Sequence, residues 1–153
     1  MTAKDKFLGK LSLEKSQATG LVAADRDETT KEWSVSLNTL FDQMESWLKT
    51  AIDEQLLTVD RIQTEVNEPE LGDFETPELI LTTPRGHKVH IGHDVRLVIG
   101  FMGKVVLKSG PQKSTLYRTS DKKWVIGVRD FSKLNTFELN EDNFLEMIME
   151  LLP

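Results

Sequence analysis

A long amphipathic stretch without glycine or proline constrains this chain more than any other feature. Neither residue type occurs in residues 21–68. Thr29 and Glu32 have the spacing of a capping box, in which a hydroxyl and a carboxylate satisfy the free backbone N–H groups of a helix start. We therefore expect one helix over residues 29–57. Its apolar residues recur at steps of three and four and form one stripe: Trp33, Leu37, Leu40, Phe41, Met44, Trp47, Leu48, Ala51 and Ile52.

Length and composition are those of an ordinary globular domain. The chain has 153 residues, of which 39% are hydrophobic and 29% are charged, so we expect one domain with a substantial core. It has no cysteine, which excludes disulfides, thiolate nucleophiles and cysteine-ligated metals. The sequence contains neither a signal-peptide pattern nor an apolar run long enough to span a bilayer. We expect a cytoplasmic protein without membrane association.

The hydrophobic period changes to two after residue 57. Ile62, Thr64 and Val66 alternate with polar residues, as is typical of a half-buried strand. Residues 65–78 then hold six carboxylates and no Lys or Arg, and they are interrupted by two prolines and a glycine. We interpret this segment as an acidic surface connection. Its spacing lacks the alternating ligands of a calcium-binding loop.

Short apolar segments separated by turn residues follow as far as residue 128. Residues 79–81 and 89–91 flank Pro84, Arg85 and Gly86, which predicts a hairpin. Further strands are expected at 95–99, 105–107, 115–117 and 124–128, with a turn at residues 100–103. Strands that start 8–12 residues apart are joined as antiparallel hairpins, because a parallel crossover needs a longer connection.

A last helix is expected near the C-terminal end, where Asn140 can act as its cap. Phe144, Ile148 and Leu151 share one face of this helix. The predicted fold class is α+β: an antiparallel meander or half-barrel of five to six strands packs against the long amphipathic helix and the C-terminal helix. The single domain 1–153 would comprise a helical part over 1–57, the sheet over 58–130 and the C-terminal helix over 131–153.

The three histidines are the first candidates for a metal site. His87, His90 and His93 follow one another at steps of three, and imidazole is a common transition-metal ligand. In an extended segment His90 faces away from the other two. Three imidazoles could therefore converge only at a sharp bend, and exposed hairpin histidines are the favoured interpretation. No nucleophile elbow or phosphate loop is present, and we expect neither a cofactor nor a catalytic residue.

Charge is distributed unevenly along the chain. Residues 1–84 carry 8 Lys/Arg and 17 Asp/Glu, residues 85–133 carry 11 and 3, and residues 134–153 carry none and 5. Cations and aromatic residues on strands can bind single-stranded nucleic acid by phosphate neutralisation and stacking. Nucleic-acid binding through the basic region 85–133 is therefore the alternative function, with Arg118, Lys122, Lys123 and Arg129 as candidate contacts.

Protein binding is the favoured function, because an acidic chain without a catalytic set can still recognise a basic partner through its surface. The candidate contacts lie in the acidic connection: Glu65, Glu68, Glu70, Asp73 and Glu75. The order of long helix, antiparallel strands and closing helix resembles small bacterial immunity and accessory proteins. That resemblance implies a non-catalytic protein, a monomer or homodimer, that neutralises or escorts a partner protein.

Overall fold

The computed structural model describes residues 2–68, 72–94, 103–130 and 132–153, with only the backbone of residues 9, 10 and 12–27. These residues belong to two compact units, Met1–Ser36 and Leu37–Pro153. Helix α1 (Ala3–Trp47) accounts for residues 3–36 of the first unit and for residues 37–47 at the start of the second. The second unit holds the sheet, and all surfaces discussed below belong to it.

Helix α1 begins far earlier than predicted. It starts at Ala3, so Thr29 and Glu32 lie inside it and do not form its cap. The reciprocal cap is made by Thr2 and Asp5: the Asp5 N–H donates to Thr2 Oγ1 at 3.2 Å and the Thr2 N–H donates to Asp5 Oδ2 at 3.3 Å. The helix passes through Gly9 and Gly20, because one glycine costs a helix only about 1 kcal/mol relative to alanine.

The helix also ends earlier than predicted. Helix α1 stops at Trp47, and the short helix α2 (Lys49–Asp53) follows it. Gln55 then has φ of 60°, a left-handed conformation that ends helical structure. The chain is extended from Thr58 onward, as the change to a period of two predicted.

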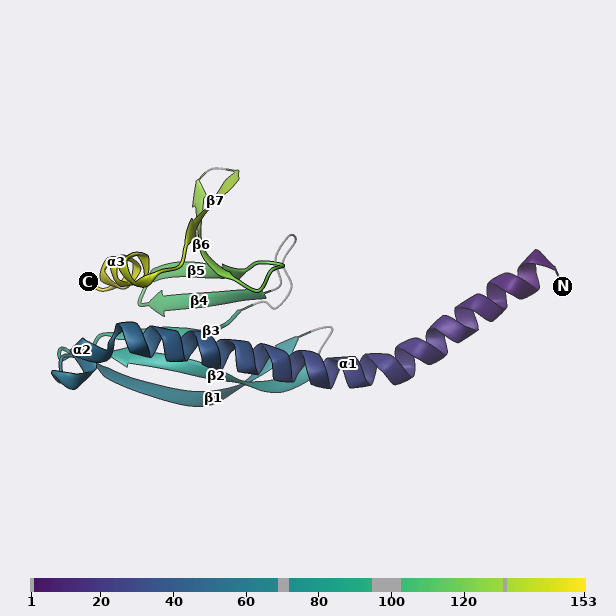
Figure 1. Cartoon of the computed structure of the whole chain (residues 1–153), viewed down its shortest axis with the longest axis horizontal. Coiled ribbons are helices and arrows are strands. Elements are labelled where there is room, and N and C mark those ends of the chain that lie inside the picture. The colour runs from purple at the N-terminus through teal and green to yellow at the C-terminus, as the bar shows by residue number, and fades with distance from the viewer. Residues whose placement is uncertain (1, 69–71, 95–102, 131) are drawn as a thin grey trace. The chain divides into compact units, whose positions relative to one another are not determined.

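The sheet is an open antiparallel meander in which every strand pairs with its neighbours in sequence (Figure 1). This confirms the α+β class and the meander, but the described residues form seven strands where five to six were predicted. The strands are β1 (Thr58–Glu68), β2 (Gly72–Thr82), β3 (Lys88–His93), β4 (Gly103–Ser109), β5 (Gln112–Arg118), β6 (Trp124–Asp130) and β7 (Lys133–Glu138). The strand predicted at 95–99 and residues 100–102 of the predicted turn lie outside the described residues.

The described residues of the acidic segment, 65–68 and 72–78, are not a surface connection but lie in two paired strands. Strands β1 and β2 pair along their whole length, from Thr58 opposite Thr82 to Glu68 opposite Gly72. Pro77 is tolerated because the pairing of β2 with β3 extends only to Leu79, which leaves residue 77 without a partner strand on that side. Charge and proline content therefore gave a wrong prediction where pairing with β1 decides the conformation.

Strand β7 was missed in a region predicted to be helical. The C-terminal helix α3 begins only at Glu141 and ends at Leu151. Residues 133–138 pair with β6 instead, from Lys133 opposite Asp130 to Glu138 opposite Val125. Every residue of β7 except Leu134 is exposed. The strand consequently has little apolar pattern of its own, and its conformation is set by hydrogen bonding to β6.

The turn predicted around Pro84, Arg85 and Gly86 is present. The Thr83 N–H donates to the His87 carbonyl at 2.9 Å, and the Gly86 N–H donates to the Thr83 carbonyl at 2.9 Å. Gly86 has φ of 87° and Gly110, between β4 and β5, has φ of 56°, a region that glycine enters without the steric cost of a Cβ atom. These turns fix the register of the strands that follow them.

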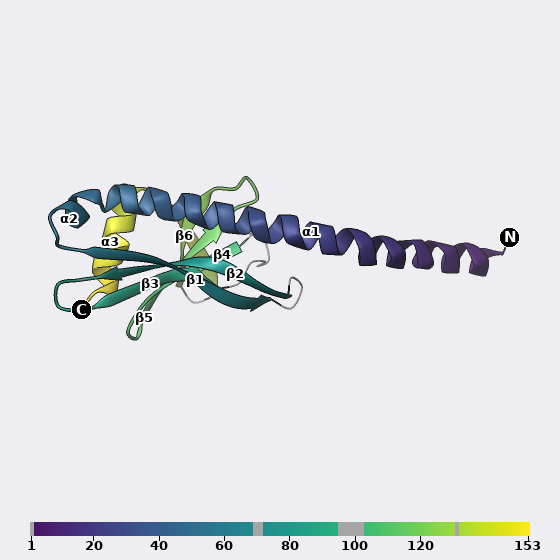
Figure 2. The same ribbon diagram turned by 90° about the horizontal axis from the view of Figure 1, so that it is seen from below.

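One face of the sheet forms the core together with the helices. Leu79, Ile91, Val105 and Leu107 are fully buried, and the strand register places them on this helix-side face. The apolar stripe of α1 supplies Leu37, Leu40, Phe41 and Met44, and α3 supplies Phe144, Met147, Ile148 and Leu151. Figure 2 shows α3 beside the last turns of α1, where the rings of Trp47 and Phe144 lie 5.4 Å apart.

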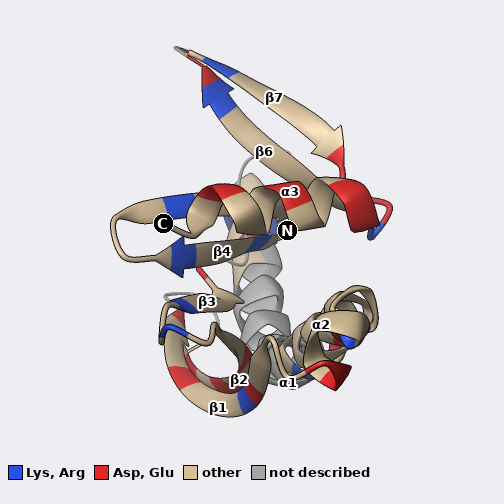
Figure 3. Ribbon diagram, turned by 90° about the vertical axis from the view of Figure 1, so that its left-hand side faces the viewer, with Lys and Arg blue, Asp and Glu red and all other residues tan. Residues whose placement is uncertain are grey.

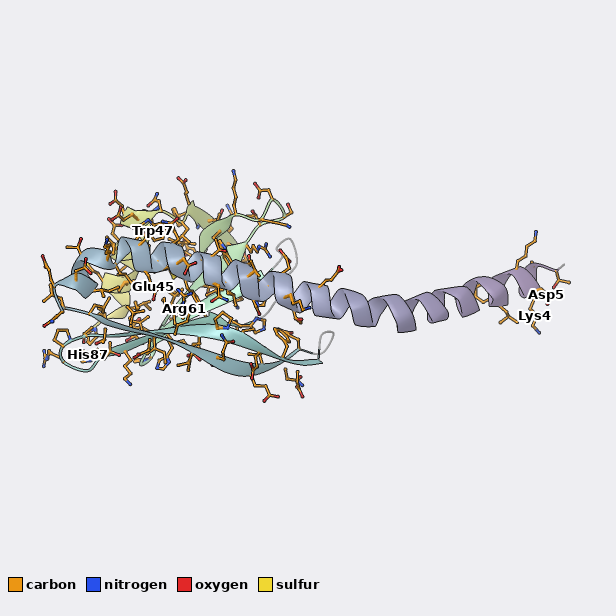
Figure 4. The ribbon with its side chains drawn as sticks, turned by 60° about the horizontal axis from the view of Figure 1, so that its bottom comes forward. Lys4, Asp5, Glu45, Trp47, Arg61 and His87 are labelled. Carbon is orange, nitrogen blue, oxygen red and sulfur yellow. The ribbon has the colours of Figure 1, made fainter. Side chains whose placement is uncertain are left out.

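Arg61 ties β1 to the last turns of α1. Its guanidinium lies 2.6 Å from Glu45 Oε2, 3.1 Å from Asp42 Oδ1 and 3.3 Å from Asn38 Oδ1. Figure 4 shows Arg61 close to Glu45. Because Arg61 lies opposite Leu79 in the register, these bonds also identify the Leu79 face as the helix side.

Candidate functional surfaces

The three histidines have different partners in the structure, and only His90 is exposed, although all three were expected to be. His90 Nδ1 lies 3.1 Å from Glu78 Oε1, and His93 Nε2 lies 2.5 Å from Glu68 Oε1. His87 lies in the β2–β3 turn and is half-buried. Among the described residues no three His, Asp or Glu side chains are arranged to hold a metal ion.

His90, its partner Glu78, and His93 line one pocket. The pocket has a volume of about 150 Å³. Glu78 also accepts a 2.9 Å hydrogen bond from Thr64 Oγ1, so β1, β2 and β3 together fix the orientation of the His90 ring. The side chain of His93 is 3% exposed, whereas that of His90 is 48% exposed. His90 is therefore the member of these pairs that can meet a ligand. The pocket is lined by Thr64, Val66, Thr76, Glu78, His90, Gly92, His93, Asp94, Val106 and Lys108.

The acidic residues predicted to bind a partner do not act as one group. Glu65 and Glu75 lie directly opposite each other and Asp73 is two residues from Glu75, so these three exposed carboxylates share one face of the β1–β2 hairpin. Glu68 is instead held by His93, with its side chain only 14% exposed. Glu70 lies outside the described residues.

The four cations predicted to contact nucleic acid are also divided. Arg118 is 3% exposed, so it is not a surface contact for phosphate. Lys122 and Lys123 lie exposed in the β5–β6 turn, beside Asp121. The pKa of the Asp121 carboxyl is lowered, chiefly by the hydrogen bond from Thr119 and less by Lys123. Arg129 is exposed on β6.

A different group of basic residues is brought together on the face of the sheet opposite the helices, which we call the outer face. His90 lies opposite Lys108, and Lys108 lies opposite Lys113, so the three side chains form a row across β3, β4 and β5. Lys88, two residues before His90, shares this face. All four are exposed. We name Lys88, His90, Lys108 and Lys113 the outer cation cluster.

Sequence reasoning missed this cluster because its members come from three strands. Each residue was visible as one cation of a basic region, but only the register shows which of them share a face. The turn chemistry that sets the register, at Gly86 and Gly110, was the signal that could have grouped them. Figure 3 shows Lys and Arg residues (blue) on β4 and Asp and Glu residues (red) along α3.

Apolar side chains remain uncovered where the sheet ends. Phe137 of β7 lies opposite Ile126 of β6, and Val128 is two residues further along β6, so the three share the helix-side face. Ile126 is 8% exposed, but Val128 is 48% and Phe137 is 52% exposed. The apolar residues of the helix-side face therefore continue from the buried Ile126 to the exposed Val128 and Phe137.

The chain matches no family model, no curated protein and no solved structure. Among the described residues no helix is long and apolar enough to cross a bilayer. The assignment of function therefore depends on the surfaces above.

Proposed function

We propose that this chain is a non-catalytic protein-binding module of the cytoplasm that recognises a partner by pairing β7 with an extended strand of that partner. An immunity or accessory role, in which the chain neutralises or escorts the partner, is the form of this function that its architecture suggests. The observation that carries the proposal is the edge strand β7, whose residues other than Leu134 are exposed beside the uncovered side chains of Val128 and Phe137.

An edge strand directs the N–H and C=O groups of alternate residues away from its neighbour, and those groups can pair with another strand. Soluble proteins usually protect such an edge with charge, proline or a bulge. The other edge, β1, carries Asp60, Arg61 and Glu65 in its span. Strand β7 has charge only at its terminal residues, Lys133 and Glu138. The inner residues of β7 are therefore the less protected edge, and Phe137 offers an apolar contact for a partner side chain.

The acidic face formed by Glu65, Asp73 and Glu75 supports a basic partner. These carboxylates lie on β1 and β2, at the other end of the strand order from β7. They would raise the association rate by electrostatic steering and would add little to the lifetime of the complex. Charge reversal of these residues would therefore slow association with a basic partner, and the effect would diminish as salt is added.

The test is recovery of the partner from native cells by the intact chain, comparing the wild type with Phe137→Lys and Ile62→Lys. Ile62 is the matched control, because it is an exposed apolar residue (43%) on the other edge strand. We expect one stoichiometric partner that is retained by Ile62→Lys and lost from Phe137→Lys. In the purified complex, amide hydrogen exchange of β7 should slow. Equal retention by both variants, or β7 exchange unchanged in the complex, would contradict the proposal.

A further inference from the structure

The outer cation cluster places like charges together at a cost that the fold does not require. Lys108 and Lys113 lie directly opposite each other, and like charges in that position destabilise a sheet by several tenths of a kcal/mol. No described carboxylate forms an ion pair with Lys88, Lys108 or Lys113. A positively charged surface is thereby maintained on a chain whose net charge is −6.

Strand β4 carries a second lysine, Lys104, whose charge is neutralised by a carboxylate. Lys104 Nζ lies 3.1 Å from Asp94 Oδ2. Lys108, four residues further along, instead faces His90 on one side and Lys113 on the other. Strand β4 therefore carries one lysine that is neutralised within the protein and one that lies between His90 and a second lysine.

His90 adds an oriented group to this row. Glu78 holds its Nδ1 atom at 3.1 Å, and Thr64 holds Glu78 at 2.9 Å. Because the carboxylate binds Nδ1, the Nε2 atom is the ring nitrogen that remains for a ligand. Adjacent strands lie about 4.8 Å apart, so the ligand would meet His90, Lys108 and Lys113 within about 10 Å.

We propose that the outer cation cluster binds the phosphate backbone of nucleic acid. Lysine is a common phosphate ligand that acts as a point charge, so the lysines of the cluster can meet successive phosphates without a fixed contact geometry. Tyr117 lies on this face but is only 6% exposed, so it cannot serve as an open stacking platform for bases. Binding is therefore through phosphates, independent of sequence, and uses residues other than those of β7.

The experiment measures binding of a fluorescein-labelled 30-base-pair DNA duplex to the full chain by fluorescence anisotropy between 25 and 200 mM salt. We expect weak binding that falls with salt, with a slope of log K against log salt of about −2 to −3, because each neutralised phosphate contributes about −0.9. The variant Lys108→Gln/Lys113→Gln should bind at least about tenfold more weakly at the lowest salt.

The matched control is Lys122→Gln/Lys123→Gln, which removes the same charge from exposed lysines in the β5–β6 turn and should bind as the wild type does. The melting temperature of Lys108→Gln/Lys113→Gln should stay equal or rise, because the like-charge pair is removed. A loss of binding without loss of stability supports a ligand role for these lysines.

Three results would overturn the inference. They are absence of duplex binding at the lowest salt, equal weakening by both double variants, and equal competition by polyglutamate at matched charge. The last result would assign the cluster to an acidic protein segment. Phe137→Lys should leave duplex binding unchanged, so failure here and failure of strand pairing at β7 can be distinguished.

Discussion

At the scale of single residues, Gly127 of β6 has no room for a side chain. A Cβ atom on Gly127 would lie 2.2 Å from Tyr117 Cε2 and 2.5 Å from Tyr117 Cδ2. The tyrosine ring thus lies across the glycine of the neighbouring strand. Aromatic residues pack over glycine in this way because the missing side chain leaves room for the ring and the ring covers the exposed backbone.

We predict that Gly127→Ala destabilises the protein by about 1–3 kcal/mol, because the ring of Tyr117 must leave its position to admit the methyl group. Urea denaturation followed by tryptophan fluorescence measures the change. In a Tyr117→Leu background the same substitution should cost less, since the clash involves the ring edge. An identical cost in both backgrounds would show that Tyr117 is not the obstacle.

At the scale of elements, α3 is the helix whose start the sequence located best. Asn140 accepts a 2.8 Å hydrogen bond from the Asn143 N–H through its Oδ1 atom. Glu141 and Asp142 occupy the first turn, where negative charge interacts favourably with the helix dipole. Phe144 and Leu151 then bury the helix on the sheet.

Asn140→Ala should lower the free energy of unfolding by about 1 kcal/mol, because the cap is lost and one N–H group of the first turn is left without its acceptor. The measurement is again equilibrium unfolding in urea. Asn140→Ser retains a capping oxygen and should restore most of the loss. If serine and alanine were equally destabilising, the cap would not be the cause.

At the scale of the whole molecule, the boundary between the two compact units, after Ser36, predicts a position at which the chain can be truncated. The second compact unit, Leu37–Pro153, contains all seven strands together with α2 and α3. Of the described buried apolar side chains, all but that of Trp33 lie within it. Residues 1–36 should therefore be dispensable for folding of the sheet.

We predict that a fragment of residues 37–153 unfolds cooperatively and gives a dispersed amide NMR spectrum, because it keeps every described buried apolar side chain except that of Trp33. Thermal unfolding and a two-dimensional NMR spectrum test this. The full chain under the same conditions is the control. A fragment with collapsed amide dispersion would show that the sheet depends on the first unit.

The sequence by itself determined the features that depend on local chemistry. These are the amphipathic stripe from Leu37 to Leu48, the cap at Asn140, and the turn at Gly86. Each follows from residue periodicity or from a residue that suits one backbone conformation. The α+β class and the antiparallel meander followed from the same patterns.

The tertiary structure alone decided the strand conformation of residues 65–68, 72–78 and 133–138, which depends on hydrogen bonds to other strands rather than on local propensity. It also decided which side chains meet. The pairs of His90 with Glu78 and of His93 with Glu68 join residues from different strands, as does the outer cation cluster. The register of strand pairing sets these contacts, and a shift of one strand by one residue would move its side chains to the opposite face.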